Sequence, residues 1–254
     1  AGLPNATFHD ADLLVNWIRS VKSPAEVDYL RKASRLAEAA VRAAYDTIAP
    51  GVRECDAIAK IQAAQIAGAP DFAGDITALP PTILAGENAS APHVMWSDRR
   101  FGENETVALE LAGVVRRYTS GLARTLQLGK MPTKVSDTSK AVLEGMEAVL
   151  ASIRPGVTAE AVEASWRRVI ERHGLKKESR IGYSIGVAYP PDWGEHTISL
   201  RPGDTTILQP GNVLHSILGM WMDGWGIEVS ETILVTEAGC ETLTNFPRDI
   251  HVKA

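Results

Sequence analysis

Glu110 is an acidic residue in surroundings that do not suit an ordinary surface carboxylate. It lies within residues 107–112, an apolar run with the pattern of a buried strand. An ionised carboxylate at such a position destabilises a fold unless it is paired or used. Two interpretations are open: a structural ion pair, for example with Arg124, or a role in proton transfer or nucleophilic attack.

His93 ends the turn-rich stretch of residues 86–93, which leads toward the same apolar run. An imidazole titrates near neutral pH, so it can donate or accept a proton under physiological conditions. A histidine in a loop can also simply face water. With Glu110, His93 forms a candidate pair for acid–base catalysis.

Residues 226–232 form a second polar signal inside hydrophobic sequence. The period of a strand places Glu228, Ser230 and Thr232 on one face, and Val229 and Glu231 on the other. We expect the face with Glu228 either to line a cleft or to face water.

The first element that could position these residues begins at Ser23. Ser23, Pro24 and Glu26 have the spacing of a helix N-cap, a proline in the first turn and a capping glutamate. The helix is predicted to run to about residue 49. Residues 1–22 lack a second periodic element, so we interpret them as a connector and residues 23–254 as the catalytic domain.

An internal similarity links residues 40–68 and residues 145–174. Each stretch is a helix ended by Pro-Gly-Val, followed by a second amphipathic helix ended by glycine. Strand-like runs follow each pair. The sequence therefore predicts an α+β fold with two pseudo-symmetric α-α-β halves around a curved, mostly antiparallel sheet, and a cleft where the halves meet.

Composition limits the classes of protein that fit. The chain has 254 residues, of which 45% are hydrophobic and 22% charged, as is typical of a soluble globular protein. No apolar run has the length of a bilayer span and no secretory leader opens the chain, so we expect a cytoplasmic protein without a membrane partner. A net charge of -5 without a basic stripe predicts no nucleic-acid partner. Cys55 and Cys240 are interpreted as two structural thiols.

Residues 88–128, with the strings NASAPH and VALELAGVVRRYTSGLARTLQLG, resemble the creatinase/aminopeptidase P family. The resemblance extends over nearly the whole chain, including both Pro-Gly-Val helix ends and the closing string GIEVSETILVT. It implies the pita-bread fold, a small-molecule substrate and a homodimer. It also implies a further domain before the connector of residues 1–22.

The metallopeptidases of this family hold two metal ions through two aspartates, a histidine and two glutamates. The resemblance places these five positions on Glu110, Gly121, Tyr183, Ile217 and Ser230. Only one of the five is a carboxylate, and glycine and isoleucine have no donor atom in their side chains. We therefore expect neither a metal nor another cofactor.

His93 falls on the position of the family's proton-transfer histidine, and creatinase itself cleaves a C–N bond without metal. Residues 182–195 (GYSIGVAYPPDWGE) and 220–228 (MWMDGWGIE) resemble the ectoine hydrolase branch, which opens a cyclic amidine. The resemblance implies a metal-free hydrolase of a small cyclic amidine or guanidino acid. Glu110 would attack the amidinium carbon or activate water, and His93 would protonate the departing nitrogen.

Several side chains are candidates for holding such a substrate. Tryptophans in the two aromatic strings could stack on a cationic ring, or could be ordinary core residues. Glu228 could pair with amidinium nitrogens, and Arg124 or Tyr189 with a carboxylate. The predicted substrate-binding residues are Tyr183, Tyr189, Trp193, Trp221, Trp225, Glu228, Arg124 and His215.

Two other functions compete with this hypothesis. The first is an Xaa-Pro dipeptidase-like metallopeptidase, which the count of metal ligands disfavours. The second is an inactive pita-bread module that binds a peptide or protein, which the presence of both His93 and Glu110 disfavours.

Overall fold

The helix predicted from the cap at Ser23 is present. In the computed structural model, which describes residues 2–253, α2 (Pro24–Thr47) begins directly after Ser23, whose backbone N–H donates to the Glu26 carboxylate. A short helix, α1 (Leu14–Arg19), precedes it inside the predicted connector and has no buried residue. Within residues 2–253, no helix is both long and apolar enough to cross a membrane.

The remaining helices follow the predicted repeat. In the first half α2 is followed by α3 (Glu54–Ala67), and in the second half α4 (Thr133–Ser152) is followed by α5 (Ala159–Arg172). In each pair an isoleucine, Ile48 or Ile153, is the C-cap of the first helix and precedes the Pro-Gly-Val turn.

A nine-stranded sheet joins the two halves. The main path has the order β1-β2-β3-β4-β6-β7-β8, while β5 pairs with β4 and β9 pairs with β3. Every pairing is antiparallel except that of β3 with β9. The strands are β1 (Thr82–Ala85), β2 (Thr106–Val115), β3 (Tyr118–Leu128), β4 (Gly182–Tyr189), β5 (Asp192–Ser199), β6 (Val213–Met222), β7 (Trp225–Val235), β8 (Cys240–Thr242) and β9 (His251–Lys253).

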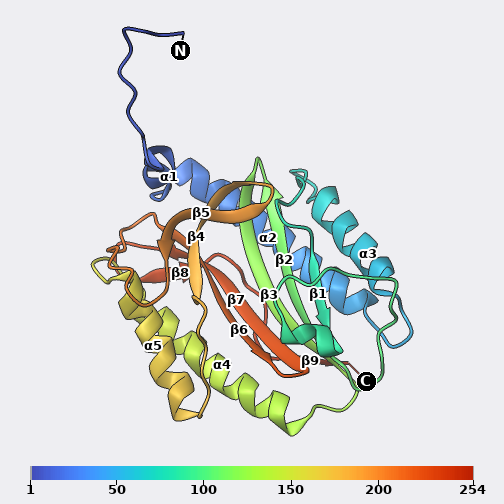
Figure 1. The fold of residues 1–254 in the computed structure, drawn as a ribbon. Coiled ribbons are helices and arrows are strands. Elements are labelled where there is room, and N and C mark those ends of the chain that lie inside the picture. The colour runs from blue at the N-terminus through green and yellow to red at the C-terminus, as the bar shows by residue number, and fades with distance from the viewer. Residues whose placement is uncertain (1, 254) are drawn as a thin grey trace.

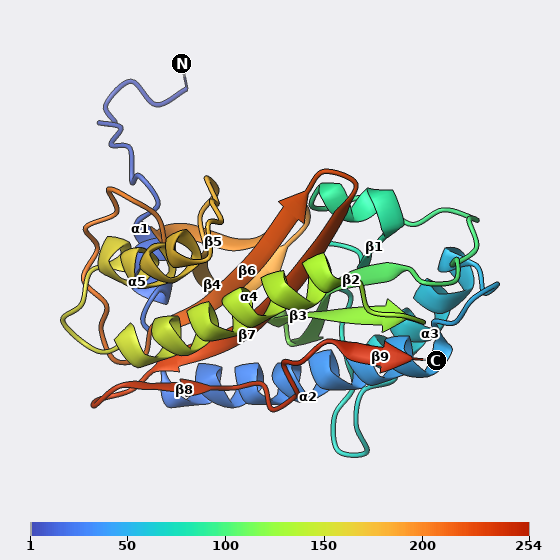
Figure 2. The same cartoon turned by 90° about the horizontal axis from the view of Figure 1, so that it is seen from below.

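The two helical pairs lie over different parts of this sheet (Figure 1). Figure 2 shows α2 and α4 running along the strands as two separate rods. Val41, Ile58 and Leu109 belong to one large apolar cluster, whereas Trp166 and Val229 belong to a second. The predicted α+β arrangement of two α-α-β halves around an antiparallel-rich sheet is confirmed, and the sheet is not closed.

The halves meet where β7 lies against β3. The Ser230 hydroxyl accepts from the backbone N–H of Ala123 at 2.6 Å, and the Thr232 hydroxyl donates to the Gly121 carbonyl oxygen at 3.0 Å. The polar face of β7 is therefore buried, and its hydroxyls satisfy the backbone of the neighbouring strand. We expected this face either to line a cleft or to face water, but the Ser230 and Thr232 hydroxyls do neither, because they are buried against β3.

One glycine brings the His93 loop to this junction. A side chain at Gly226 would place its Cβ 1.9 Å from the carbonyl oxygen of Ala89 in η1 (Gly86–Ser90), so β7 and η1 approach each other as closely as backbones allow. The loop that follows η1 contains His93 and lies beside the buried sheet.

Candidate active site

Glu110 and His93 lie together. Glu110 is in the middle of β2 and is 2% exposed, and its Oε2 is 3.3 Å from Nε2 of His93. His93 has a left-handed backbone conformation, with φ of 58°, and a side chain that is more than half exposed. A buried carboxylate thus meets a solvent-accessible imidazole. The Glu110 carboxylate beside the ring raises the pKa of His93, which favours the imidazolium form.

Glu228 is a second acid in the same interior. It lies on β7, is 0% exposed, and both of its carboxyl oxygens lack a hydrogen-bond partner within residues 2–253. Burial, assisted by the charge of Glu110, raises the pKa of Glu228 well above its usual value. The indole Nε1 of Trp221 is also buried without a partner among the described residues. The Trp221 indole acts in the opposite direction on the pKa of Glu228, as a neighbouring N–H donor does, although the two groups do not meet the geometry of a hydrogen bond. Glu228 and Trp221 therefore lie next to each other beside the Glu110–His93 pair, and both can still bond to a ligand.

Lys177 brings a cation to this group of acids. It lies in the irregular segment between α5 and β4, and its Nζ donates to the Gly219 carbonyl oxygen at 2.6 Å. The same ammonium is 3.9 Å from the ring centroid of Trp221. Burial lowers its pKa to about 8, against the charges of Glu228 and Glu110, which favour protonation.

A chain of hydrogen bonds crosses the junction behind Glu110. The Ser230 Oγ is 2.8 Å from Nε2 of His215, and the Nδ1 of His215 is 3.2 Å from the Tyr183 hydroxyl. Burial lowers the pKa of His215 to about 4, so the imidazole is neutral, and burial raises the pKa of Tyr183 well above its usual value. His215 and Tyr183 are therefore both uncharged at neutral pH.

These residues replace the metal ligands that the family resemblance implies. A Cβ at Gly121 would lie 2.8 Å from the His215 ring, so the imidazole fills the space of a side chain at that position. Ile217 is 8% exposed and packs with apolar neighbours, and the Ser230 hydroxyl is already bonded twice. Between residues 2 and 253, no three His, Cys, Asp or Glu side chains are gathered as metal ligands would be. The residues present do not fit a dinuclear metal pair.

The predicted aromatic residues do not all lie at this site. Trp193 is 1% exposed and its ring centroid is 5.8 Å from that of His215, and Trp221 lies beside Lys177. Trp225 instead lines a separate surface cavity of about 350 Å³, with Lys134 over its ring. Tyr189 is 65% exposed at the end of β4 and stacks on Arg117.

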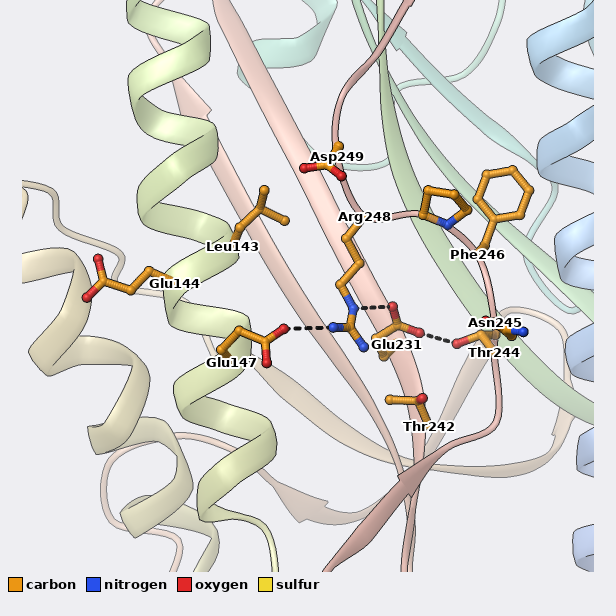
Figure 3. Close-up of a pocket in the computed structure, with 11 residues that line it drawn as sticks. Leu143, Glu144, Glu147, Glu231, Thr242, Thr244, Asn245, Phe246, Arg248 and Asp249 are labelled. Atoms are coloured by element: carbon orange, nitrogen blue, oxygen red, sulfur yellow. Dashed lines mark hydrogen bonds and ion pairs between the residues drawn. The ribbon is translucent and has the colours of Figure 1, made fainter.

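Arg124 does not fit the interpretation as a substrate ligand. All five of its N–H donors are used, four by carbonyl oxygens and one by Glu231, at 2.6–2.8 Å. Glu231 also accepts from Arg248 and Thr244 beside a cavity of about 640 Å³ (Figure 3). Arg124 is neither paired with Glu110 nor free for a ligand, because it joins β3, β7 and the C-terminal segment.

Sequence reasoning missed Lys177 and Arg180. Both lie in the polar segment before β4, and the guanidinium of Arg180 is 4.3 Å from the ring centroid of Tyr183. The available signal was a cluster of basic residues directly before the strand that contains Tyr183. From the sequence alone, basic residues in a polar loop that bind a ligand cannot be distinguished from basic residues that simply face water.

We expect Glu228→Gln to change how stability depends on pH. Because the folded protein raises the pKa of Glu228 above its ordinary value of 4.5, the folded state holds this proton more tightly than the unfolded chain. The free energy of unfolding contributed by Glu228 therefore falls as the pH rises above that value, and glutamine removes this loss. Urea unfolding at about pH 5 and about pH 8 measures the difference.

The exposed Glu171→Gln on α5 serves as the matched control for that experiment. It should keep the wild-type dependence on pH. If the Glu228→Gln variant has the same dependence as well, Glu228 does not hold a proton in the folded protein.

The fold and the arrangement of the site define a pita-bread protein. Prolidase from Pyrococcus furiosus superposes with a TM-score of 0.86 at 26% identity, over 95% of this chain and 70% of that chain. A dipeptidase from Pyrococcus horikoshii OT3 superposes with a TM-score of 0.87 at 24% identity, over 97% and 67% of the two chains. These likenesses confirm the predicted fold.

Residues 28–237 match the model of metallopeptidase family M24, and the chain belongs to that family. It is 40% identical over 257 residues to the ectoine hydrolase of Halomonas elongata, covering 99% of this chain and 64% of that protein. It is 42% identical over 251 residues to an uncharacterized hydrolase/peptidase of Sinorhizobium fredii, again covering 99% and 64%. The chain thus spans less than two thirds of these relatives. The predicted family is confirmed.

Proposed function

We propose that this chain hydrolyses a C–N bond of a small cyclic amidine of the ectoine type, without a catalytic metal. The observation that carries the proposal is the Glu110–His93 pair beside Glu228, a buried acid with both carboxyl oxygens unpartnered within the described residues. The similarity to a protein named ectoine hydrolase supports the choice of substrate class.

The chemistry follows from the positions of the two catalytic groups. An amidinium carbon is electrophilic, and the Glu110 carboxylate either attacks it or removes a proton from the water that attacks it. The ring C–N bond then breaks, and the departing nitrogen takes a proton from His93 and leaves as an amine. If Glu110 has attacked the carbon itself, water then attacks the same carbon and displaces the Glu110 carboxylate, which breaks the covalent bond and restores the free enzyme. On either route the oxygen from water becomes the carbonyl oxygen of the amide product, so one water is consumed in each turnover.

Glu228 and Trp221 suit recognition of the ring. An amidinium carries N–H donors, which are the partners that the carboxyl of Glu228 lacks. The positive charge of the ligand would also favour ionisation of Glu228, and so would strengthen the contact. Trp193 and the neutral His215 are buried and pack near each other, so they would support the site from inside and not contact the ring directly.

The charge on the substrate also explains how hydrolysis could proceed without a metal ion. In a metallopeptidase the ions polarise a neutral carbonyl, whereas an amidinium already carries the positive charge that makes its carbon electrophilic. Gly121 and Ile217 provide no donors for such ions. The homodimer, the cytoplasmic location and the connector role of residues 1–22 stay predictions.

A panel of substrates tests this function. Ectoine, hydroxyectoine, creatine and an Xaa-Pro dipeptide are incubated with the protein, and release of amine is measured. We expect turnover of the cyclic amidines and none of the dipeptide. Cleavage of the dipeptide without any ring opening would favour the peptidase alternative, and binding of a peptide without turnover would favour the binding module.

A further inference from the structure

We propose that Arg180 binds the carboxylate of the substrate, and so favours cyclic amidines that carry an anionic group over those that lack one. This inference rests on the proposed function, because it concerns the other end of the same ligand. Arg180 takes the role of carboxylate ligand that the sequence suggested for Arg124, whose donors are all used inside the fold.

Arg180 places a cation on the ring of Tyr183, at the exposed end of the buried hydrogen-bond chain. Arg180 is exposed and lies two residues before β4, and its guanidinium covers the ring of Tyr183 at 4.3 Å. Tyr183 is 9% exposed, and its hydroxyl reaches inward to the Nδ1 of His215 at 3.2 Å. One tyrosine therefore has a guanidinium on its ring and the buried hydrogen-bond chain at its hydroxyl.

The charge of Arg180 acts on His93 and on His215. The neighbouring Glu110 carboxylate raises the pKa of His93, and the charge of Arg180 acts in the opposite direction on the same imidazole. The charge of Arg180 likewise disfavours protonation of His215, whose pKa is lowered chiefly by burial. Arg180 thus lies within electrostatic reach of the groups around the proposed reaction centre.

Arg180 also has an unused binding capacity. Within residues 2–253 its side chain has no ion pair and no hydrogen bond, whereas Arg117 on the neighbouring turn bonds to Ala188, Ile76 and Asp75. A guanidinium offers parallel N–H donors that match a carboxylate, and stacking on an aromatic ring holds the planar group in place. An arginine held in this way is ready to bind an anion.

The interior acids decide which end of the ligand faces Arg180. The Glu110 carboxylate would repel a carboxylate and attract an amidinium, and the protonated Glu228 can ionise only beside a cation, so a small zwitterion should enter with its cation inward. Lys177 is a poorer anchor because its ammonium is already bonded to Gly219 and lies near both acids. The carboxylate is then left at the exposed end, beside Arg180.

The test compares ectoine with its descarboxy analogue, which is the same methylated ring without the carboxylate. For Arg180→Gln we expect the KM for ectoine to rise about 10- to 100-fold, as for the loss of a hydrogen bond between charged groups. The kcat for ectoine should change little. The kcat/KM for the analogue should stay within about twofold of the wild-type value, since the lost contact has no partner there.

Two further variants sharpen the comparison. Arg180→Lys keeps the charge without the planar fork and should recover part of the affinity for ectoine. Arg154→Gln, at an exposed arginine beyond α4, should behave as wild type with both compounds.

The outcomes separate the two proposals. If wild type turns over both rings and Arg180→Gln affects them equally, or affects neither, Arg180 does not bind the carboxylate and the hydrolase proposal stands. If wild type opens neither ring, the hydrolase proposal fails and the role of Arg180 falls with it. If Arg180→Gln raises the KM for ectoine but leaves kcat/KM for the analogue unchanged, both proposals are supported.

Discussion

Glu110→Gln should lower the kcat for ectoine by about 10³-fold or more, as expected when the group that attacks or activates water is removed. Glutamine has nearly the shape of glutamate, so it keeps the buried position in β2 but cannot act as nucleophile or base. Binding should be largely retained, because the contacts of the ring with Glu228 and Trp221 are not altered. Single-turnover assays give the rate, and calorimetric titration with ectoine gives the Kd.

The exposed Glu171→Gln provides a control for the loss of one negative charge, and it should have wild-type kinetics. Turnover by Glu110→Gln close to the wild-type rate would remove Glu110 from the reaction. A loss of affinity as large as the loss of rate would instead make Glu110 a binding residue.

His93→Gln should lower kcat by about 10²- to 10⁴-fold, the range for removal of a general acid or base. The imidazolium is the form that protonates the leaving nitrogen, and the neighbouring Glu110 carboxylate raises the pKa of His93. In wild type, activity should therefore fall as the pH rises through that raised pKa, because the proton donor is lost. The residual activity of the variant should lack this fall.

The kcat measured across pH for wild type and for His93→Gln tests this assignment. His9→Gln, at an exposed histidine near the start of the chain, serves as control and should keep the wild-type profile. An alkaline fall that persists unchanged in His93→Gln would assign the titration to another group.

Much of the fold could be predicted from local signals. The cap at Ser23 and the repeated Pro-Gly-Val turns fix where helices begin and end, because these residues set backbone angles locally. Strand β5 was not predicted, since Pro190 and Pro191 indicate only a turn there. Its buried Glu195 forms an ion pair with Lys22, a residue far away in the sequence, with 2.6 Å between Oε2 of Glu195 and Nζ of Lys22.

In the candidate site too, some residues are revealed by the local sequence and others only by contacts between distant parts of the chain. Glu110 stands out because its carboxylate interrupts an apolar strand, and that signal lies within a few residues. Arg124 looked similar, but its partners come from β7 and from residues 246–247, which the sequence around Arg124 does not reveal. Arg180 was missed because only the fold places it on Tyr183.

The most direct test of metal-free amidine hydrolysis is ectoine turnover by protein that has been treated with a chelator and analysed for bound metal. We expect the rate of amine release to be unchanged by the chelator, with manganese, cobalt, zinc and iron all below stoichiometric amounts. Addition of these ions should not raise the rate. Activity that disappears with the chelator and returns with one of the metals would contradict the proposed mechanism.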